Sequence, residues 1–280
     1  MDGSAKQDGD AKPIAPLLRW AGGKRRLLTD LMMLLPPDVR SRRYYEPFAG
    51  GASLFFALCP ESAVLSDANA HLIKCYEFVR DVPQRVAAYL RMHASRTCRD
   101  YYYTVRSVYN QRRYSAAQAA RFIYLNKTCF NGIFRVNKRG KFNVPYGWKE
   151  PPALPDEDAL VRASKALKRA KLLAAPFEEI LSAPRIGDFV YLDPPYPPLN
   201  GSAYFTHYTR GRFGEADQER LAASFCALTK RGCLVMMSNA DTSLTRNLYR
   251  PFKARHLEVT RYVSCKKQKH RAQELIITNY

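Results

Sequence analysis

The sequence lacks an apolar run long enough to cross a lipid bilayer, which takes about 20 residues in a helix. The longest apolar stretch, around residues 27–35, is interrupted by Asp30. The first residues, MDGSAKQDGDAKP, are polar and contain no apolar signal core. We therefore expect a loose tail over residues 1–16 on a soluble, cytoplasmic protein with no membrane partner.

Closely spaced cysteines are also missing. The seven cysteines are scattered, none belongs to a CxxC pair, and the five histidines are dispersed. Zinc sites and redox motifs need such residues at short, regular spacing. We expect reduced thiols and no metal ion.

Acidic residues are scarce relative to basic ones. Lys plus Arg number 45 and Asp plus Glu number 25, which gives a net charge of +20 and a pI near 9.8. Solubility alone needs only a modest charge, so this excess favours a polyanionic partner, most often nucleic acid. An anionic membrane is the weaker alternative, because no clean basic amphipathic helix is present.

Strands and helices alternate in the first part of the chain. A strand at 44–46 leads through the turn PFAGG into a helix at 53–58, and a strand at 63–65 ends at SDAN before a helix at 70–79. This order is typical of the first half of a doubly wound α/β sheet.

The pattern changes after residue 82. Residues 82–125 are helical in pattern, and Asn137-Lys138-Arg139-Gly140 suggests a hairpin tip between two short strands, so this region is interpreted as an insertion. The α/β pattern then returns, with a helix at 156–170 and strands at 171–174, 189–192, 234–238, 257–264 and 274–280. We expect a lid over residues 197–214 and a basic loop over 266–271.

The strongest chemical signal is Asp193-Pro194-Pro195-Tyr196, which follows the apolar strand at 189–192. Ligands bind at the carboxyl ends of strands in open α/β sheets. Two prolines fix the backbone and cannot donate hydrogen bonds. The Asp193 carboxylate and the Pro194 carbonyl therefore lie side by side as acceptors, and Tyr196 adds a flat ring. This set suits an amino group on a planar base, whereas the alternative is a proline-rich turn with a solvated Asp193.

A second signal is the turn Glu46-Pro47-Phe48-Ala49-Gly50-Gly51, whose small residues let a ligand approach the backbone. An ordinary turn would have the same composition. Asp67 follows about twenty residues later, the spacing at which an acid binds a ribose hydroxyl in nucleotide sites. The alternative role for Asp67 is that of a helix N-cap.

A third signal is Arg19-Trp20-Ala21-Gly22-Gly23-Lys24, which does not have the spacing of a P-loop. Gly-Gly-Lys at a helix start would suit a carboxylate, held by backbone amides and the ammonium. The alternative is a capped helix with a solvated Lys24.

Together these motifs, in this order, resemble the α-group (D12 class) of S-adenosylmethionine-dependent DNA adenine-N6 methyltransferases, the Dam family. The resemblance extends over residues 17–280 and includes further phrases at 126–147, 205–208, 238–242 and 274–275. It implies a class I methyltransferase fold, which is a Rossmann-like doubly wound mixed sheet with an inserted helical and hairpin target-recognition domain. The implied parts are a tail (1–16), a cofactor-binding catalytic part (17–81), the target-recognition insertion (82–150) and a second catalytic part (151–280).

The resemblance also implies roles for individual residues. The adenine site would consist of Asp193, Pro194 and Tyr196. The site for S-adenosyl-L-methionine would consist of Trp20 and Lys24 at the methionine end, Asp67 at the ribose, and Phe48, Ala49, Gly50, Gly51 and Asp193 around them. The residues that bind DNA would be Arg19, Phe130, Asn131, Ile133, Arg135 and Pro145. Arg19 stands where the family often has a Lys that contacts guanine, and an Arg fork contacts guanine O6 and N7 equally well.

The implied reaction is adenine-specific methylation of double-stranded DNA, within GATC, after the base is flipped out of the duplex. The implied setting is a bacterial or phage-encoded enzyme that acts at the nucleoid, with a cognate restriction endonuclease as a candidate partner. One departure is Ala175-Pro176-Phe177, which stands where many relatives carry a polar or acidic residue before an aromatic.

Other methylation reactions make different demands on the sequence. Cytosine-C5 methylation uses a cysteine preceded by proline, and no Pro-Cys dipeptide occurs. Methylation of cytosine N4, of guanine N2 or of rRNA stays open, because related tetrapeptides serve those reactions. A catalytically inactive DNA-binding module is the alternative of a different class.

Overall fold

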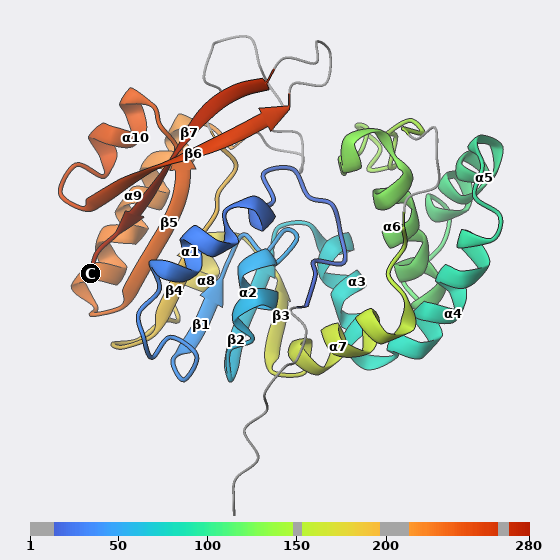
Figure 1. Cartoon of the computed structure of the whole chain (residues 1–280), viewed down its shortest axis with the longest axis horizontal. Coiled ribbons are helices and arrows are strands. Elements are labelled where there is room, and N and C mark those ends of the chain that lie inside the picture. The colour runs from blue at the N-terminus through green and yellow to red at the C-terminus, as the bar shows by residue number, and fades with distance from the viewer. Residues whose placement is uncertain (1–13, 148–152, 197–212, 263–268) are drawn as a thin grey trace, which may run out of the picture.

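Seven strands form one mixed sheet in the computed structural model, which describes residues 14–147, 153–196, 213–262 and 269–280 (Figure 1). The strand order is β3-β2-β1-β4-β5-β7-β6. Strands β1 to β5 are parallel, whereas β7 is antiparallel to both β5 and β6. The strands are β1 (Arg43–Glu46), β2 (Ser62–Asp67), β3 (Ala170–Ala174), β4 (Phe189–Leu192), β5 (Leu234–Ala240), β6 (Lys253–Tyr262) and β7 (Lys269–Thr278). The predicted doubly wound mixed sheet is confirmed.

Alternate side chains of each strand enter two different hydrophobic layers, as the two-residue period of a strand requires. On β1, Tyr44 packs into one layer and Tyr45 into the other, and on β4 the neighbours Tyr191 and Leu192 separate in the same way. The helices that contribute to the first layer are α1 (Leu28–Met33), α2 (Ser53–Leu58) and α3 (Ala70–Asp81), and those of the second are α8 (Phe177–Leu181), α9 (Glu215–Lys230) and α10 (Ser243–Leu248).

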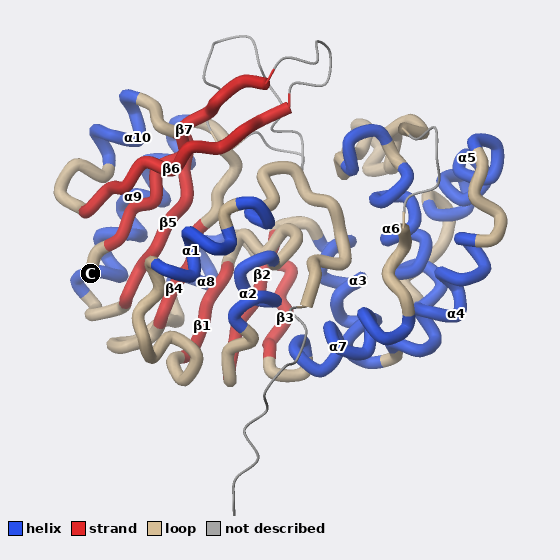
Figure 2. Tube along the Cα trace, viewed as in Figure 1, coloured by secondary structure: helices blue, strands red, loops and turns tan. Residues whose placement is uncertain are grey.

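A group of helices lies beside the β3 edge of the sheet (Figure 2). Helix α4 packs against α6 and α7, and α6 packs against α3. Their buried side chains belong to the same cluster as the first layer of the sheet, so this region extends the main core. The boundaries at residues 82 and 150 stay predictions. The helices are α4 (Pro83–Ala94), α5 (Arg99–Tyr109), α6 (Ala116–Thr128) and α7 (Glu157–Leu167).

Two details differ from the sequence predictions. The hairpin tip at 137–140 is present, but its arms are not strands, since only the single bridges Val136–Phe142 and Cys129–Tyr146 form. Helices α8, α9 and α10 occupy stretches for which no helix was predicted. The predicted lid falls largely on residues 197–212, outside the described residues. Of the predicted basic loop, residues 266–268 also lie outside them, but the prediction is wrong for Lys269, His270 and Arg271, because these residues pair with β6 as the first part of β7.

The described helices include none with the length and apolar character that a membrane crossing needs.

Replacing Phe225 by Ala should destabilise the fold by about 3–5 kcal/mol, the usual cost of removing a buried Phe side chain. Phe225 is 0% exposed and its ring lies 5.4 Å from that of Tyr249 and 4.6 Å from that of Phe252. Urea unfolding measures the change. The control is Met33→Ala, because Met33 is 72% exposed and such surface changes stay within about 0.5 kcal/mol. Equal midpoints for the two variants would show that this layer is not packed as described.

Candidate active site

Three loops and the N-terminal segment meet at the carboxyl ends of β1, β2 and β4. These strands are neighbours in the sheet, so the turn at 47–52, the loop at 67–69 and the loop at 193–196 lie along one edge. The segment at 19–24 reaches the same edge, where Lys24 contacts Asp193. Open α/β sheets bind their ligands at such an edge.

Lys24 lies at the centre of this edge. Its ammonium is 2.8 Å from a carboxylate oxygen of Asp193 and 3.7 Å from one of Glu274 on β7. It also donates to the Gly22 carbonyl at 2.6 Å and lies 4.7 Å from the centre of the Tyr196 ring. Lys24 is only 3% exposed, and the side chain of Asp193, although 19% exposed, is paired with it. The alternatives of a solvated Lys24 and a freely solvated Asp193 are therefore both wrong.

Three carboxyl groups at this edge hold a proton more readily than usual. Burial raises the pKa of Asp193 to about 6 in spite of the Lys24 ammonium, and burial raises the pKa of Asp67 to about 6 as well. Glu46 ends β1, and burial raises its pKa to about 8, although the Tyr44 hydroxyl donates to it at 2.9 Å. A positively charged ligand beside these groups would favour their ionised forms.

Asp67 fixes the turn after β1. Its two carboxylate oxygens accept the backbone N–H of Gly50 at 3.0 Å and of Asn69 at 2.8 Å. Asn69, not Asp67, is the N-cap of α3, because the Asn69 side chain accepts from His71 and Leu72. The N-cap alternative for Asp67 is therefore wrong.

Small residues in this turn allow a close contact with Trp20. Gly50 has φ 45°, and a Cβ on it would lie 2.6 Å from Cδ1 of Trp20. Ala49 and Gly51 are buried beside it. Phe48 packs against Phe177, the first residue of α8, with ring centres 5.4 Å apart. At Ala175-Pro176-Phe177, where many relatives have an acidic or polar residue before an aromatic, this chain therefore places the ring of Phe177 next to the turn after β1.

The predicted DNA-contacting residues lie at the end of α6 and along the hairpin. Phe130 is 45% exposed, Asn131, Arg135 and Pro145 are exposed, and Ile133 is half-buried. The Phe130 N–H donates to the Pro145 carbonyl at 2.9 Å, and Nε of Arg135 donates to the side chain of Asn143 at 2.9 Å. Arg19 joins this group through Gly132, as the backbone of Gly132 lies directly against the Arg19 side chain.

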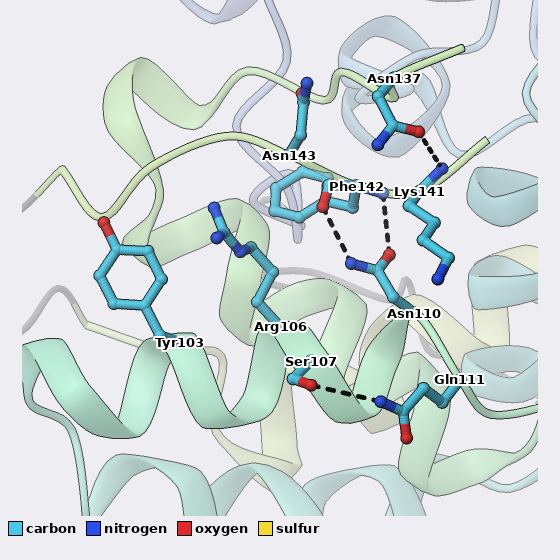
Figure 3. Close-up of a pocket in the computed structure, with 9 residues that line it drawn as sticks. All are labelled: Tyr103, Arg106, Ser107, Asn110, Gln111, Asn137, Lys141, Phe142 and Asn143. Atoms are coloured by element: carbon cyan, nitrogen blue, oxygen red, sulfur yellow. Dashed lines mark hydrogen bonds between the residues drawn. The ribbon is translucent and has the colours of Figure 1, made fainter. Parts of the chain in front are cut away.

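A groove of about 350 Å³ lies between α5 and the hairpin (Figure 3). Its lining includes the cations Arg106 and Lys141 and several amide side chains, among them Asn110. None of the residues at the sheet edge contributes to it, so it is separate from the candidate active site.

The sequence motifs assigned no role to three residues of the site. Glu46 opens the glycine-turn motif and Glu274 begins one stretch of the family resemblance, which were their only signals. Gln218 of α9 had none: it is buried, donates to the Pro195 carbonyl at 3.1 Å and accepts from the Asn239 side chain at 3.1 Å. These contacts hold the Asp-Pro-Pro-Tyr turn from behind.

No group of three or more His, Cys, Asp or Glu side chains in the described part of the chain is arranged to hold a metal ion.

The strand order of the sheet is that of a class I methyltransferase. The family model of the D12 class N6 adenine-specific DNA methyltransferases matches residues 20–263. The Type II methyltransferase M1.LlaDCHI of Lactococcus lactis subsp. cremoris is 36% identical over 274 residues, which are 95% of this chain and 96% of the relative. The DNA adenine methylases of Vibrio cholerae O395 and Escherichia coli K12 are 35% and 34% identical, over 88% of this chain and 89% and 88% of their own lengths. The chain belongs to the D12 class of N6 adenine-specific DNA methyltransferases.

Glu46→Gln should reduce the pH dependence of folding stability. The pKa of Glu46 is raised from 4.5 to about 8 on folding, so the folded protein keeps a proton that the unfolded chain releases. The stability that this group contributes is complete below its unfolded pKa and is lost as the pH rises toward 8, by up to about 1.4 kcal/mol per pH unit. Urea unfolding from about pH 5 to 8 should show a steeper fall for the wild type than for the variant. Parallel curves would mean that Glu46 is ionised throughout.

Proposed function

We propose that this protein transfers a methyl group from S-adenosyl-L-methionine to N6 of adenine in double-stranded DNA, within GATC, after flipping the adenine out of the duplex. The observation that carries the proposal is the buried contact of Asp193 with Lys24, above the ring of Tyr196, where β4 ends. The Lys24 ammonium donates to the Asp193 carboxylate, and the amino group of a planar base would donate to the same carboxylate in its place.

The residues at the sheet edge fit S-adenosyl-L-methionine. Nδ2 of Asn69 is buried without a hydrogen-bond partner in the described structure, and it lies beside Asp67, where a nucleoside would offer acceptors. The raised pKa values of Glu46 and Asp193 suit a ligand with positive charge. We assign its binding to Trp20, Lys24, Phe48, Ala49, Gly50, Gly51, Asp67 and Asp193. When bound, this cofactor supplies a methyl group on a positively charged sulfur.

Lys24 has two proposed positions. In the structure its ammonium pairs with Asp193 and lies over Tyr196, where the adenine would bind. An incoming base therefore displaces it, and the carboxylate of a methionine group is an anion to which the ammonium can turn. This exchange keeps the buried charge of Lys24 compensated in both states.

Asp193 and Pro194 prepare the nitrogen for attack. The carboxylate of Asp193 and the carbonyl of Pro194 accept the two N6–H hydrogens, which favours a more tetrahedral amino group whose lone pair is less delocalised into the ring. Tyr196 stacks on the base and orients it. Acceptors fixed before the reaction lower its barrier without further reorganisation, and Gln218 fixes this turn through the Pro195 carbonyl.

DNA is proposed to bind along the end of α6 and the hairpin. Flipping a base costs a few kcal/mol, and the exposed ring of Phe130, with Ile133 beside it, would fill the space that the adenine leaves. Arg19 and Arg135 would contact base edges, with Asn131 and Pro145 next to them. The net charge of +20 predicts that affinity falls steeply with salt.

A role in restriction and modification is a second proposal about the setting. The Lactococcus relative is named a Type II methyltransferase, which favours a cognate restriction endonuclease as partner. The names of the Vibrio and Escherichia relatives, DNA adenine methylase, do not mention such a system.

Single-molecule sequencing of unmethylated genomic DNA, after incubation with the protein and S-adenosyl-L-methionine, should detect N6-methyladenine at GATC and nowhere else. Methylation of adenine in another motif would confirm the reaction but contradict the GATC specificity, and with it the base contacts assigned to Arg19 and Arg135. Methylated RNA or methylated cytosine would identify one of the alternative reactions. No methyl transfer in the presence of bound cofactor would indicate an inactive DNA-binding module.

Replacing Asp193 by Ala should lower methyl transfer at least about 100-fold, because an acceptor to N6 is lost, while DNA binding persists. Asp188→Ala is the matched control, since Asp188 precedes the other end of the same strand. Its rate should stay within about threefold of the wild type. Transfer of tritium from labelled cofactor to duplex DNA measures both rates. A near-normal rate for Asp193→Ala would contradict the assigned mechanism.

A further inference from the structure

Asn126 joins two segments of the chain that are 107 residues apart. Its carboxamide oxygen accepts the backbone N–H of Arg19 at 2.8 Å, and its amide nitrogen donates to the Arg19 carbonyl at 2.7 Å. The same nitrogen donates to the Gly132 carbonyl at 3.1 Å. Asn126 is 2% exposed, in the last turn of α6. Both amide hydrogens are used, so the side chain holds both backbone groups of Arg19 and the recognition loop at once.

The segment that Asn126 holds touches both proposed binding sites. On the DNA side, Gly132 has φ 64°, and a Cβ on it would lie 2.5 Å from Cβ of Arg19. On the cofactor side, Trp20 lies against Gly50 and stacks on Phe134 with ring centres 6.3 Å apart. These contacts place Arg19 against the recognition loop, and its neighbour Trp20 against the glycine turn and Phe134.

The side chains of Arg19, Arg25 and Lys127 bring positive charges close together at the end of α6. Burial, together with the charges of Arg19 and Arg25, lowers the pKa of Lys127 to about 8. Like charges are thus close together on the segment at 19–25 and at the end of α6. The hydrogen bonds of Asn126 are formed by neutral groups, so they hold Arg19 in place whether or not a DNA phosphate is present to compensate these charges.

We propose that Asn126 is a positioning residue that holds Arg19 for reading guanine and Trp20 for binding the cofactor. The inference rests on the proposed function. Asn126 acts through the Arg19 backbone and touches neither substrate directly. Aspartate cannot replace it, because a carboxylate has no hydrogen to donate to the carbonyls of Arg19 and Gly132.

The first test needs no DNA. The chain has two tryptophans, Trp20 and Trp148, so a Trp148→Phe background reports on Trp20 alone. In this background, Asn126→Ala and Asn126→Asp should shift the Trp20 emission to longer wavelength, as the ring leaves Gly50 and Phe134. The dissociation constant for S-adenosyl-L-methionine, measured by equilibrium titration without DNA, should rise several-fold with it. If Asn126→Ala does not fold, Asn126→Ser, which retains a small polar group, takes its place.

Asn110 offers a matched control within the same region. Its carboxamide accepts the Phe142 N–H at 2.8 Å and donates to the Phe142 carbonyl at 3.0 Å, the same pair of bonds on another residue (Figure 3). Asn110→Ala therefore loses comparable hydrogen bonds but leaves the Arg19 backbone held. It should change neither the Trp20 emission nor the reading of guanine.

The second test measures how the enzyme reads the guanine. In a duplex whose GATC guanine is replaced by 7-deazaguanine, the base lacks the N7 atom that accepts a hydrogen bond from an Arg guanidinium. The wild type and Asn110→Ala should lose at least about tenfold in kcat/KM on this duplex, and Asn126→Ala and Arg19→Ala less than about threefold. The double variant Arg19→Ala with Asn126→Ala should be no worse on this measure than either single variant, since the two residues act through one contact.

The outcomes separate the two levels of the proposal. Normal Trp20 emission and full guanine discrimination in Asn126→Ala would overturn the positioning role. A wild type that methylates DNA without discriminating against 7-deazaguanine would overturn the Arg19 part alone. If the wild type methylates no DNA, the proposed function is wrong, and so is the proposed contact of Arg19 with guanine. The Trp20 emission would still show whether Asn126 holds Arg19 and Trp20 in place.

Discussion

The buried ion pair between Lys24 and Asp193 is the interaction on which the candidate site depends. An ammonium is tolerated inside a protein only where acceptors compensate its lost hydration, and here Asp193 at 2.8 Å and Glu274 at 3.7 Å do so. Because these residues come from the N-terminal segment, the end of β4 and the antiparallel strand β7, the pair holds three distant parts of the chain at one edge of the sheet. Lys24 also occupies the Asp193 oxygen that the proposed adenine amino group would use, so on this proposal the base would replace one hydrogen-bond donor by another.

The N-terminal segment connects this edge to the helical region beside it. Trp20 lies between the glycine turn after β1 and Phe134, and Arg19 lies between Asn126 and Gly132. The helices α4 to α6 share one hydrophobic cluster with the first layer of the sheet. The sheet edge and the hairpin loop are therefore placed relative to each other by continuous packing and by hydrogen bonds to a single backbone stretch. This arrangement keeps the candidate active site and the surface proposed to read DNA in a fixed position relative to each other.

Local patterns predicted the strands and the helices α2, α3 and α7, and missed the helices α8 to α10. The helix α2 and the strand β4 lie where their apolar runs and flanking turns indicated, because burial on both faces makes a parallel strand uniformly apolar. Helices α8 to α10 carry no motif, and their apolar residues face a layer that only the folded sheet supplies. The choice between Asp67 and Asn69 as N-cap could not be made locally, since both residue types form caps and lie two positions apart. The arms of the hairpin have strand-like residues, but each forms only a single bridge.

The sequence by itself determined the succession of strands along the chain, the place of Asp193 after β4, the turn with Gly50 and Gly51, and the excess of positive charge. These features depend on side-chain chemistry and on periodicity along the chain, which are local. Only the tertiary structure decided that Lys24 is buried against Asp193, that Glu274 accepts from Tyr196 across 78 residues, and that Asn126 holds Arg19 across 107. The raised pKa of Glu46 was likewise decided by folding, because desolvation and distances between remote residues exist only once the chain has packed.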